Sequence, residues 1–161
     1  MSIYDIFETL NISYKQIEHP AVFTIEESKL VDKDLGGIGC KNLLLTDRRR
    51  EQFFLVLLEQ DKRADTKALA KLAGVSRLVF AHAEELLAVL GLTPGSVSPF
   101  GIIHDKNNVV TLIIDEALVD GKLQFHPNDN TKTVLVDYAD LIRFIEYEEH
   151  RYLLLPETLE S

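Results

Sequence analysis

Lys41 and its neighbour Asn42 are polar residues that could do chemistry at the start of the apolar segment KNLLLT. Strand alternation would place Lys41 on the same face as Leu43 and Leu45. A lysine on such a face either lies at the end of its strand and extends its ammonium to water, or is held in a cleft. In a cleft, the ammonium could bind a carboxylate, a phosphate or a developing oxyanion, with the Asn42 amide as a hydrogen-bonding neighbour.

The segment GSVSPFG combines two glycines, two serines and a proline in a short loop between a helix-ending glycine and a β-rich run. This composition lets backbone N–H groups approach a bound molecule closely. Loops of this kind are more often plain turns, so the segment becomes a binding candidate only together with other polar residues. The candidate loop comprises Gly95, Ser96, Val97, Ser98, Pro99, Phe100 and Gly101.

His126 is a third candidate, because the following proline favours an extended backbone at the end of the segment KLQF, and an Asx-type turn follows at 128–130. Its ring could overhang a site at the sheet edge, although a single histidine beside a turn is more often structural or exposed. His19 also precedes a proline and has the same two interpretations. The other histidines lack metal-ligand spacing, so we expect no zinc or iron site. They are His82, His104 and His150.

Cys40 is the only cysteine, which excludes an internal disulfide and a multi-cysteine zinc site. Its place beside a buried strand favours a small apolar role over that of a nucleophile, because no hydrolase motif surrounds it. The glycine fingerprint of dinucleotide-binding proteins and the phosphate loop are both absent. Hydride transfer and nucleotide hydrolysis therefore lose their main sequence support.

Length and composition limit the classes of protein to which this chain can belong. A chain of 161 residues that is 46% hydrophobic can bury a sizeable core, so we expect one domain over residues 1–161. No apolar stretch approaches the roughly 20 residues that span a bilayer. The start MSIYDIFETL carries acidic residues where a signal peptide would carry basic ones. We therefore expect a cytoplasmic protein with no membrane partner.

The formal net charge of −9 argues against a general nucleic-acid coat, since neutralising phosphates requires a surplus of lysine and arginine. We expect no DNA partner, but a local basic patch is compatible with this charge. One group of cations surrounds the first expected hairpin, where it either contacts a nucleic-acid backbone or forms a solvated turn. The group comprises Arg48, Arg49, Arg50, Lys62, Arg63 and Lys67.

Apolar periodicity alternates between helices and strands and predicts an α+β fold with a mixed, mainly antiparallel sheet. Helices are expected over residues 2–10, from a capping box at Thr24, over 65–74, over 82–91 and after Asp137. An extended segment is expected at NISYKQIEH, and strands at RLVFA, KLQF and TKTVLVD. Two hairpins are expected: NLLLT with FFLVLLE, and GIIHD with VVTLIIDEAL across Lys106, Asn107 and Asn108.

Nearly the whole chain resembles the YbaK/ProX-type aminoacyl-tRNA editing domains, and most closely the freestanding ProX (PrdX, ProXp-ala) branch. The segment FHPNDNT favours this alanine-removing branch over the cysteine-removing YbaK branch, which lacks such a segment. The tail beyond about residue 148 lies past the usual end of the resemblance and stays unassigned. The similar segments are EHPAVFTIEES, GCKNLLLTD, RADTKALAKL, RLVFAHAEELLAVLGLTPGSVSPFGII, IIDEAL and FHPNDNTKTVLVDYADLIRFI.

The resemblance implies hydrolysis of the ester between a wrong amino acid, typically alanine, and the tRNA for proline. It also implies an α+β fold with a partly barrel-like central sheet, and no metal or cofactor. Mischarged tRNA is then the partner, with prolyl-tRNA synthetase as a second candidate. The lysine, asparagine and histidine of the family fall on Lys41, Asn42 and His126, and its glycine-rich substrate loop falls on residues 95–101.

In this interpretation Lys41 and loop N–H groups stabilise the oxyanion, a ribose hydroxyl of the substrate assists, and His126 and Asn42 orient the ester or the terminal adenosine. A proline-charging site cannot strongly reject alanine, because one methylene is worth only about 1–3 kcal/mol, so a second sieve is needed. Candidates for its wall are His19, Val22 and Phe23. Two alternatives stay open: removal of cysteine or another small amino acid, and a non-catalytic module that binds an amino acid or an aminoacylated end.

Overall fold

The computed structural model describes residues 2–21, 26 and 35–157. Its centre is an eight-stranded sheet in the order β1-β7-β6-β2-β3-β5-β8, with β4 paired to β2 beside this path. The pairs β2–β6, β3–β5 and β5–β8 are parallel and the other four are antiparallel, so the sheet is mixed as expected. The strands are β1 (Lys15–Glu18), β2 (Ile38–Thr46), β3 (Phe53–Glu59), β4 (Val79–Phe80), β5 (Val110–Asp115), β6 (Lys122–Phe125), β7 (Lys132–Asp137) and β8 (Tyr152–Leu155).

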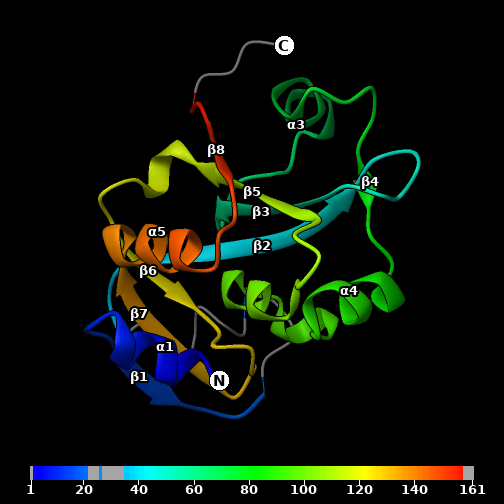
Figure 1. Cartoon of the computed structure of the whole chain (residues 1–161). Helices are drawn as coiled ribbons and strands as arrows, with labels where there is room; N and C mark the ends of the chain where they lie inside the picture. Colours follow the sequence, from blue (N-terminus) through cyan, green and yellow to red (C-terminus); the bar gives the residue numbers. More distant parts are fainter. Residues whose placement is uncertain (1, 22–25, 27–34, 158–161) are drawn as a thin grey trace.

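Helices cover both faces of the sheet (Figure 1). The larger core lies between the sheet and the helices α1, α4 and α5, and includes Phe7, Leu90 and Phe144. The smaller core lies under α3, where Leu69 packs near Leu45 of β2. The described helices are α1 (Ile3–Thr9), α3 (Thr66–Ala73), α4 (Ala83–Leu90), α5 (Tyr138–Tyr147) and the short 3-10 helices η1 (Pro94–Ser96), η2 (Pro99–His104) and η3 (Glu116–Leu118).

Local signals set the helix ends. Helix α3 begins where the Asp65 carboxylate accepts the N–H groups of Lys67 and Ala68, and ends at Gly74 with a left-handed φ of 75°. Helix α4 likewise ends at Gly91. The predicted helices over 65–74 and 82–91 are therefore confirmed, as is the opening helix. Asp137 occupies the N-cap position of α5, but its side chain makes no capping hydrogen bond.

The first predicted hairpin is confirmed: β2 and β3 pair antiparallel, with Thr46 opposite Phe53. The second predicted hairpin is wrong, because GIIHD belongs to the 3-10 helix η2 and β5 pairs in parallel with β3 and β8. Ser98 caps η2 by accepting the Phe100 N–H, and the Asp105 carboxylate accepts the N–H groups that open β5. These capping contacts bend the chain where a strand was expected.

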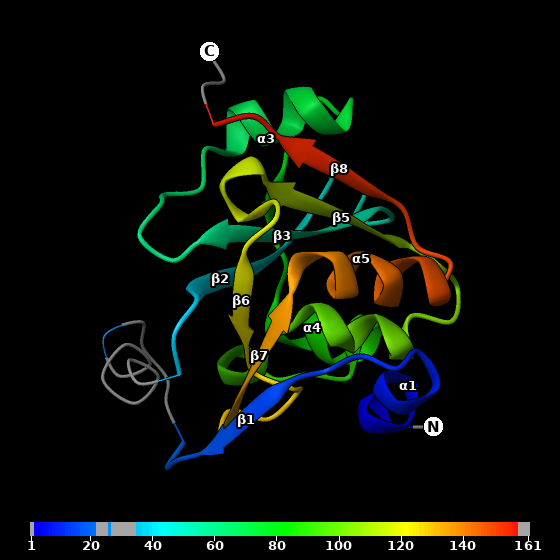
Figure 2. The same ribbon diagram turned by 90° about the vertical axis from the view of Figure 1, so that its left-hand side faces the viewer.

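The tail that could not be assigned from sequence contributes a strand. After α5 the chain turns at residues 148–151, and β8 lies beside β5 in parallel register (Figure 2). The expected helix from Thr24, and the candidates Val22 and Phe23, lie outside the described residues. In the part of the chain that the structure describes, no helix is long and apolar enough to cross a membrane.

Candidate active site

Lys41 lies inside β2 rather than at its start, because the strand begins at Ile38. Its partner across the antiparallel pair is Leu58, and alternation places its side chain on the α3 face together with Leu45. The half-buried ammonium donates a hydrogen bond to the backbone carbonyl of Lys62. An interior strand position and a fixed acceptor favour a held ammonium over one that extends into bulk water.

Asn42 follows Lys41 in the strand and therefore lies on the opposite face, where its pair partner Leu57 belongs to the larger core. Its amide oxygen Oδ1 is buried and has no hydrogen-bond partner among the described residues. An unpaired buried acceptor costs about 1–3 kcal/mol, and such groups in native proteins usually have a functional or solvent partner. The structure does not bring the Lys41 ammonium and the Asn42 amide together on one face.

Lys41 and His126 flank the point where β2 and β6 separate. The last pair of this parallel ladder is Gly39 with Gln124, and beyond it the two strands diverge (Figure 2). Lys41 lies two residues past Gly39, and His126 two residues past Gln124. Because Phe125 lies in the larger core, alternation directs His126 towards the other face of the sheet, which is the face of Lys41.

A small histidine cluster surrounds His126. Its Nδ1 is 2.9 Å from the Lys132 carbonyl, which requires a proton on Nδ1 and leaves Nε2 as the acceptor in the neutral ring. The ring of His19 lies edge-on to that of His126, with centroids 6.0 Å apart. His19 in turn contacts the Pro20 carbonyl through Nδ1 (2.9 Å) and the Thr133 hydroxyl through Nε2 (2.8 Å). The structure thus brings two of the predicted histidines together.

Much of the candidate loop is part of the core. Gly101 is closely packed, since an added Cβ would lie 2.7 Å from Leu92 Cδ1. The N–H groups of Phe100 and Gly101 bond to the hydroxyl and the carbonyl of Ser98, both at 3.1 Å. Packing and internal hydrogen bonds therefore account for the presence of Phe100 and Gly101 in this loop. Gly95 and Val97, by contrast, are only half-buried. The buried Phe100 ring contacts those of Phe7, Phe125 and Phe144.

The six cations expected as one patch form two groups at opposite ends of β3. Arg48, Arg49 and Arg50 belong to the β2–β3 turn, whereas Lys62, Arg63 and Lys67 follow the strand. The seven residues of β3 separate the groups by about 20 Å, at roughly 3.3 Å per residue. Proximity along the sequence therefore does not make a single surface.

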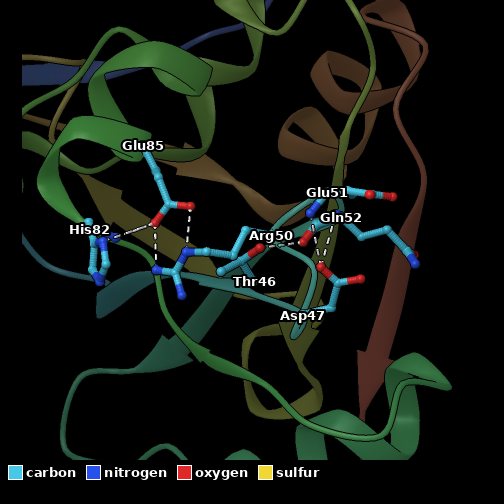
Figure 3. Close-up of polar contacts among 7 residues, drawn as sticks. All are labelled: Thr46, Asp47, Arg50, Glu51, Gln52, His82 and Glu85. Carbon is cyan, nitrogen blue, oxygen red and sulfur yellow. Dashed lines mark hydrogen bonds and ion pairs between the residues drawn. The ribbon is translucent and has the colours of Figure 1, made fainter.

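The β2–β3 turn is tightly held (Figure 3). The Asp47 carboxylate accepts the N–H groups of Glu51 and Gln52, at 3.0 and 3.3 Å. Arg50 donates two hydrogen bonds to the Glu85 carboxylate of α4, at 2.7 and 3.0 Å, and these hydrogen bonds hold the pKa of Glu85 below its ordinary value. The turn is thereby fixed against α4, and its exposed cations are Arg48 and Arg49.

Cys40 precedes Lys41 in β2 and packs against the larger core. Burial raises the pKa of its thiol well above the ordinary value, so the group stays protonated near neutral pH and is unsuited to nucleophilic attack. Across residues 2–21, 26 and 35–157, no three histidine, cysteine or acidic side chains gather in a way that could hold a metal ion.

Comparison with known proteins decides the family. The profile described as "Aminoacyl-tRNA editing domain" matches residues 19–144. The Prolyl-tRNA editing protein ProX of Acetoanaerobium sticklandii is 38% identical over 140 residues, which cover 86% of this chain and 85% of that protein. The chain belongs to the aminoacyl-tRNA editing domain family. A relative of this editing domain in Danio rerio, "Prolyl-tRNA synthetase associated domain-containing protein 1", is 34% identical over 154 residues, covering 94% of this chain and 83% of the relative.

Solved structures share the fold of the editing domain. The crystal structure of a hypothetical protein superposes with a TM-score of 0.74 at 15% identity, over 95% of this chain and 97% of that one. A structure provisionally assigned as a trans-editing enzyme for prolyl tRNA synthetase superposes with a TM-score of 0.72 at 20% identity, over 97% and 95% of the two chains. The matched span of the editing domain contains Lys41, the loop and His126, and ends before β8.

Proposed function

We propose that this protein hydrolyses the ester that links a wrongly attached small amino acid, foremost alanine, to the tRNA for proline, as a separate editing enzyme. The relative called Prolyl-tRNA editing protein ProX supports the substrate class, and membership of the editing family supports deacylation. The observation that carries the proposal is the Lys41 ammonium. It is half-buried inside a strand, fixed by the Lys62 carbonyl, and placed at the divergence of β2 and β6 together with His126.

Hydrolysis exchanges the bond between the acyl carbon and the ribose oxygen for a bond to water. Attack by water produces a tetrahedral oxyanion, which the Lys41 ammonium would stabilise. One N–H of Lys41 is taken by the Lys62 carbonyl, so two remain for the substrate. The proton released by the water passes, with help from the vicinal ribose hydroxyl of the substrate, to the departing ribose oxygen. No protein nucleophile is needed.

His126 is assigned an orienting role. Its Nδ1 donates to the Lys132 carbonyl, so Nε2 can accept a hydrogen bond from a ribose hydroxyl of the substrate. His19 lies beside it and is retained as a wall of the amino-acid pocket. Asn42 stays a candidate for substrate contact, with a buried oxygen that lacks a partner among the described residues, but it would act from the other face.

Replacing Lys41 by alanine is expected to lower the rate of deacylation of alanyl-tRNA for proline by about 100- to 1000-fold, as for loss of an oxyanion donor. Hydrolysis should be measured for alanyl-, prolyl- and cysteinyl-tRNA for proline side by side. Lys15→Ala, which removes an exposed lysine from β1, serves as the matched control and should retain the wild-type rate.

The same measurement separates the alternatives. Rapid, Lys41-dependent loss of alanine with proline spared supports the proposal, and preference for cysteine would change the substrate but not the mechanism. Unchanged rates in both Lys41→Ala and His126→Ala would refute the assigned roles. No hydrolysis of any of the three substrates by the wild-type protein would favour a module that binds aminoacylated ends without cleaving them.

A further inference from the structure

Asp115 ends the buried strand β5 on the same face of the sheet as Lys41. Its side chain is 1% exposed. Lys41 pairs with Leu58 of β3, and the parallel β3–β5 register, continued by one residue, places Leu58 beside Asp115. Lys41 and Asp115 therefore stand in one row, two strands apart, which corresponds to about 10 Å between their backbones.

The Asp115 carboxylate has three donors. Oδ1 accepts the Lys62 ammonium at 2.8 Å and the Ala117 N–H at 3.0 Å, and Oδ2 accepts the Glu59 N–H at 3.0 Å. Burial by itself would raise the pKa of Asp115, but these hydrogen bonds together hold it below its ordinary value. A buried carboxylate in this state is a fixed negative charge at the end of β3, where the chain leaves the sheet.

Lys62 joins this carboxylate to Lys41. Its ammonium is bound to Asp115, while its backbone carbonyl accepts the hydrogen bond of the Lys41 ammonium. The Lys62 N–H bonds to the Glu59 carbonyl at 3.0 Å, which closes a turn directly after β3. The position of the carbonyl that holds Lys41 therefore depends on a turn that Asp115 fixes from two sides, through Glu59 and through Lys62.

We propose that Asp115 and Lys62 are positioning residues for Lys41, an inference that rests on the function proposed above. The carboxylate fixes the turn, the turn presents the Lys62 carbonyl, and this carbonyl orients the ammonium so that its other two N–H groups face the oxyanion. Asp115 also balances the charge of Lys62, which would otherwise repel the Lys41 ammonium. Neither residue is assigned a contact with the substrate.

Steady-state deacylation of alanyl-tRNA for proline by the full-length protein tests this role. Asp115→Asn and Lys62→Met are expected to lower kcat by about 10- to 100-fold at nearly unchanged KM, because a small displacement of a catalytic group strongly lowers the rate of the chemical step. Adding Asp115→Asn to Lys41→Ala should cause little further loss, since both changes act through one ammonium. The control Asp140→Asn removes a 2.9 Å ion pair with Arg143 on α5 and should leave kcat unchanged.

A spectroscopic readout separates positioning from general destabilisation. In protein labelled with ¹⁵N-lysine, the Lys41 ammonium should give a signal protected from solvent exchange in the wild type and in Asp140→Asn. It should be lost or shifted in Asp115→Asn and in Lys62→Met, the latter at a half-exposed position that the fold tolerates more readily.

The outcomes distinguish the two proposals. An undisturbed Lys41 signal in both variants, or wild-type kcat in both while Lys41→Ala is inactive, would overturn the positioning role. Full activity of Lys41→Ala would instead refute the catalytic role of Lys41, and the signal would still report whether Asp115 and Lys62 hold its ammonium.

Discussion

His150 and Asp105 form a buried pair that is separate from the candidate active site. Both side chains are 2% exposed, and His150 Nε2 lies 2.9 Å from Asp105 Oδ2. His150 Nδ1 lies 2.8 Å from the Glu148 carbonyl, so each ring nitrogen is within hydrogen-bond distance of an oxygen. The Asp105 carboxylate also accepts the N–H groups of Val109 and Val110. The pair joins the turn before β5 to the turn before β8.

Replacing His150 by alanine is expected to lower the free energy of unfolding by about 1–3 kcal/mol, because it removes one hydrogen-bond partner of the buried Asp105 carboxylate. Urea unfolding followed by circular dichroism measures this change. His104→Ala, at an exposed histidine of η2, is the control and should change stability little. A loss below about 0.5 kcal/mol in His150→Ala would contradict a stabilising role of this hydrogen bond.

The sequence predicted the residue types of the candidate site better than their surroundings. Lys41 was identifiable because a lysine on the same strand face as leucines needs a partner, and strand alternation gave that face. That partner, the Lys62 carbonyl, could not be predicted, because a backbone acceptor carries no sequence signal. The part played by Asp115 could not be predicted either, because its link to Lys62 depends on which strands are neighbours.

Element ends that depend on nearby residues were predicted well from sequence. Asp65 and Gly74 bound α3 through contacts within one turn, so their effect is visible in the sequence itself. The expected hairpin at GIIHD failed because its apolar residues also suit a buried 3-10 helix, which Ser98 caps. Strand β8 was missed because it pairs with β5, which is far away in the chain.

The β2–β3 turn is the element on which tRNA contact is predicted. Removing both exposed cations, Arg48→Ala with Arg49→Ala, should weaken binding of tRNA and lower the slope of log Kd against log salt by about 0.7–0.9 for each lost phosphate contact. Binding titrations at several salt concentrations measure both effects. Lys106→Ala, in the exposed turn before β5, is the control. Equal slopes for the wild type and the double variant would assign these arginines to a solvated turn.

At the scale of the molecule, acid should reduce the stability of the wild type more than that of Asp115→Asn. The folded-state pKa of Asp115 is lowered by hydrogen bonds that outweigh burial. Its contribution to stability is present above the unfolded-state value of about 3.9 and is lost as pH falls through the folded pKa. Urea unfolding between about pH 7 and about pH 2 should show the two proteins converging. A constant difference across this range would contradict the prediction.

The strand order also sets when the protein can fold during synthesis. Strand β1 can pair only after β7 has been synthesised, since Lys15 lies opposite Leu135. Likewise, β5 can pair with β8 only after Tyr152, the partner of Leu112, has been synthesised. The β2–β3 and β6–β7 hairpins can form locally, because the strands of each pair are neighbours in the chain. Pairing over such separations makes folding slow. The nascent chain therefore emerges from the ribosome with unpaired strand edges, which makes it a candidate for chaperone binding until its last strand is released.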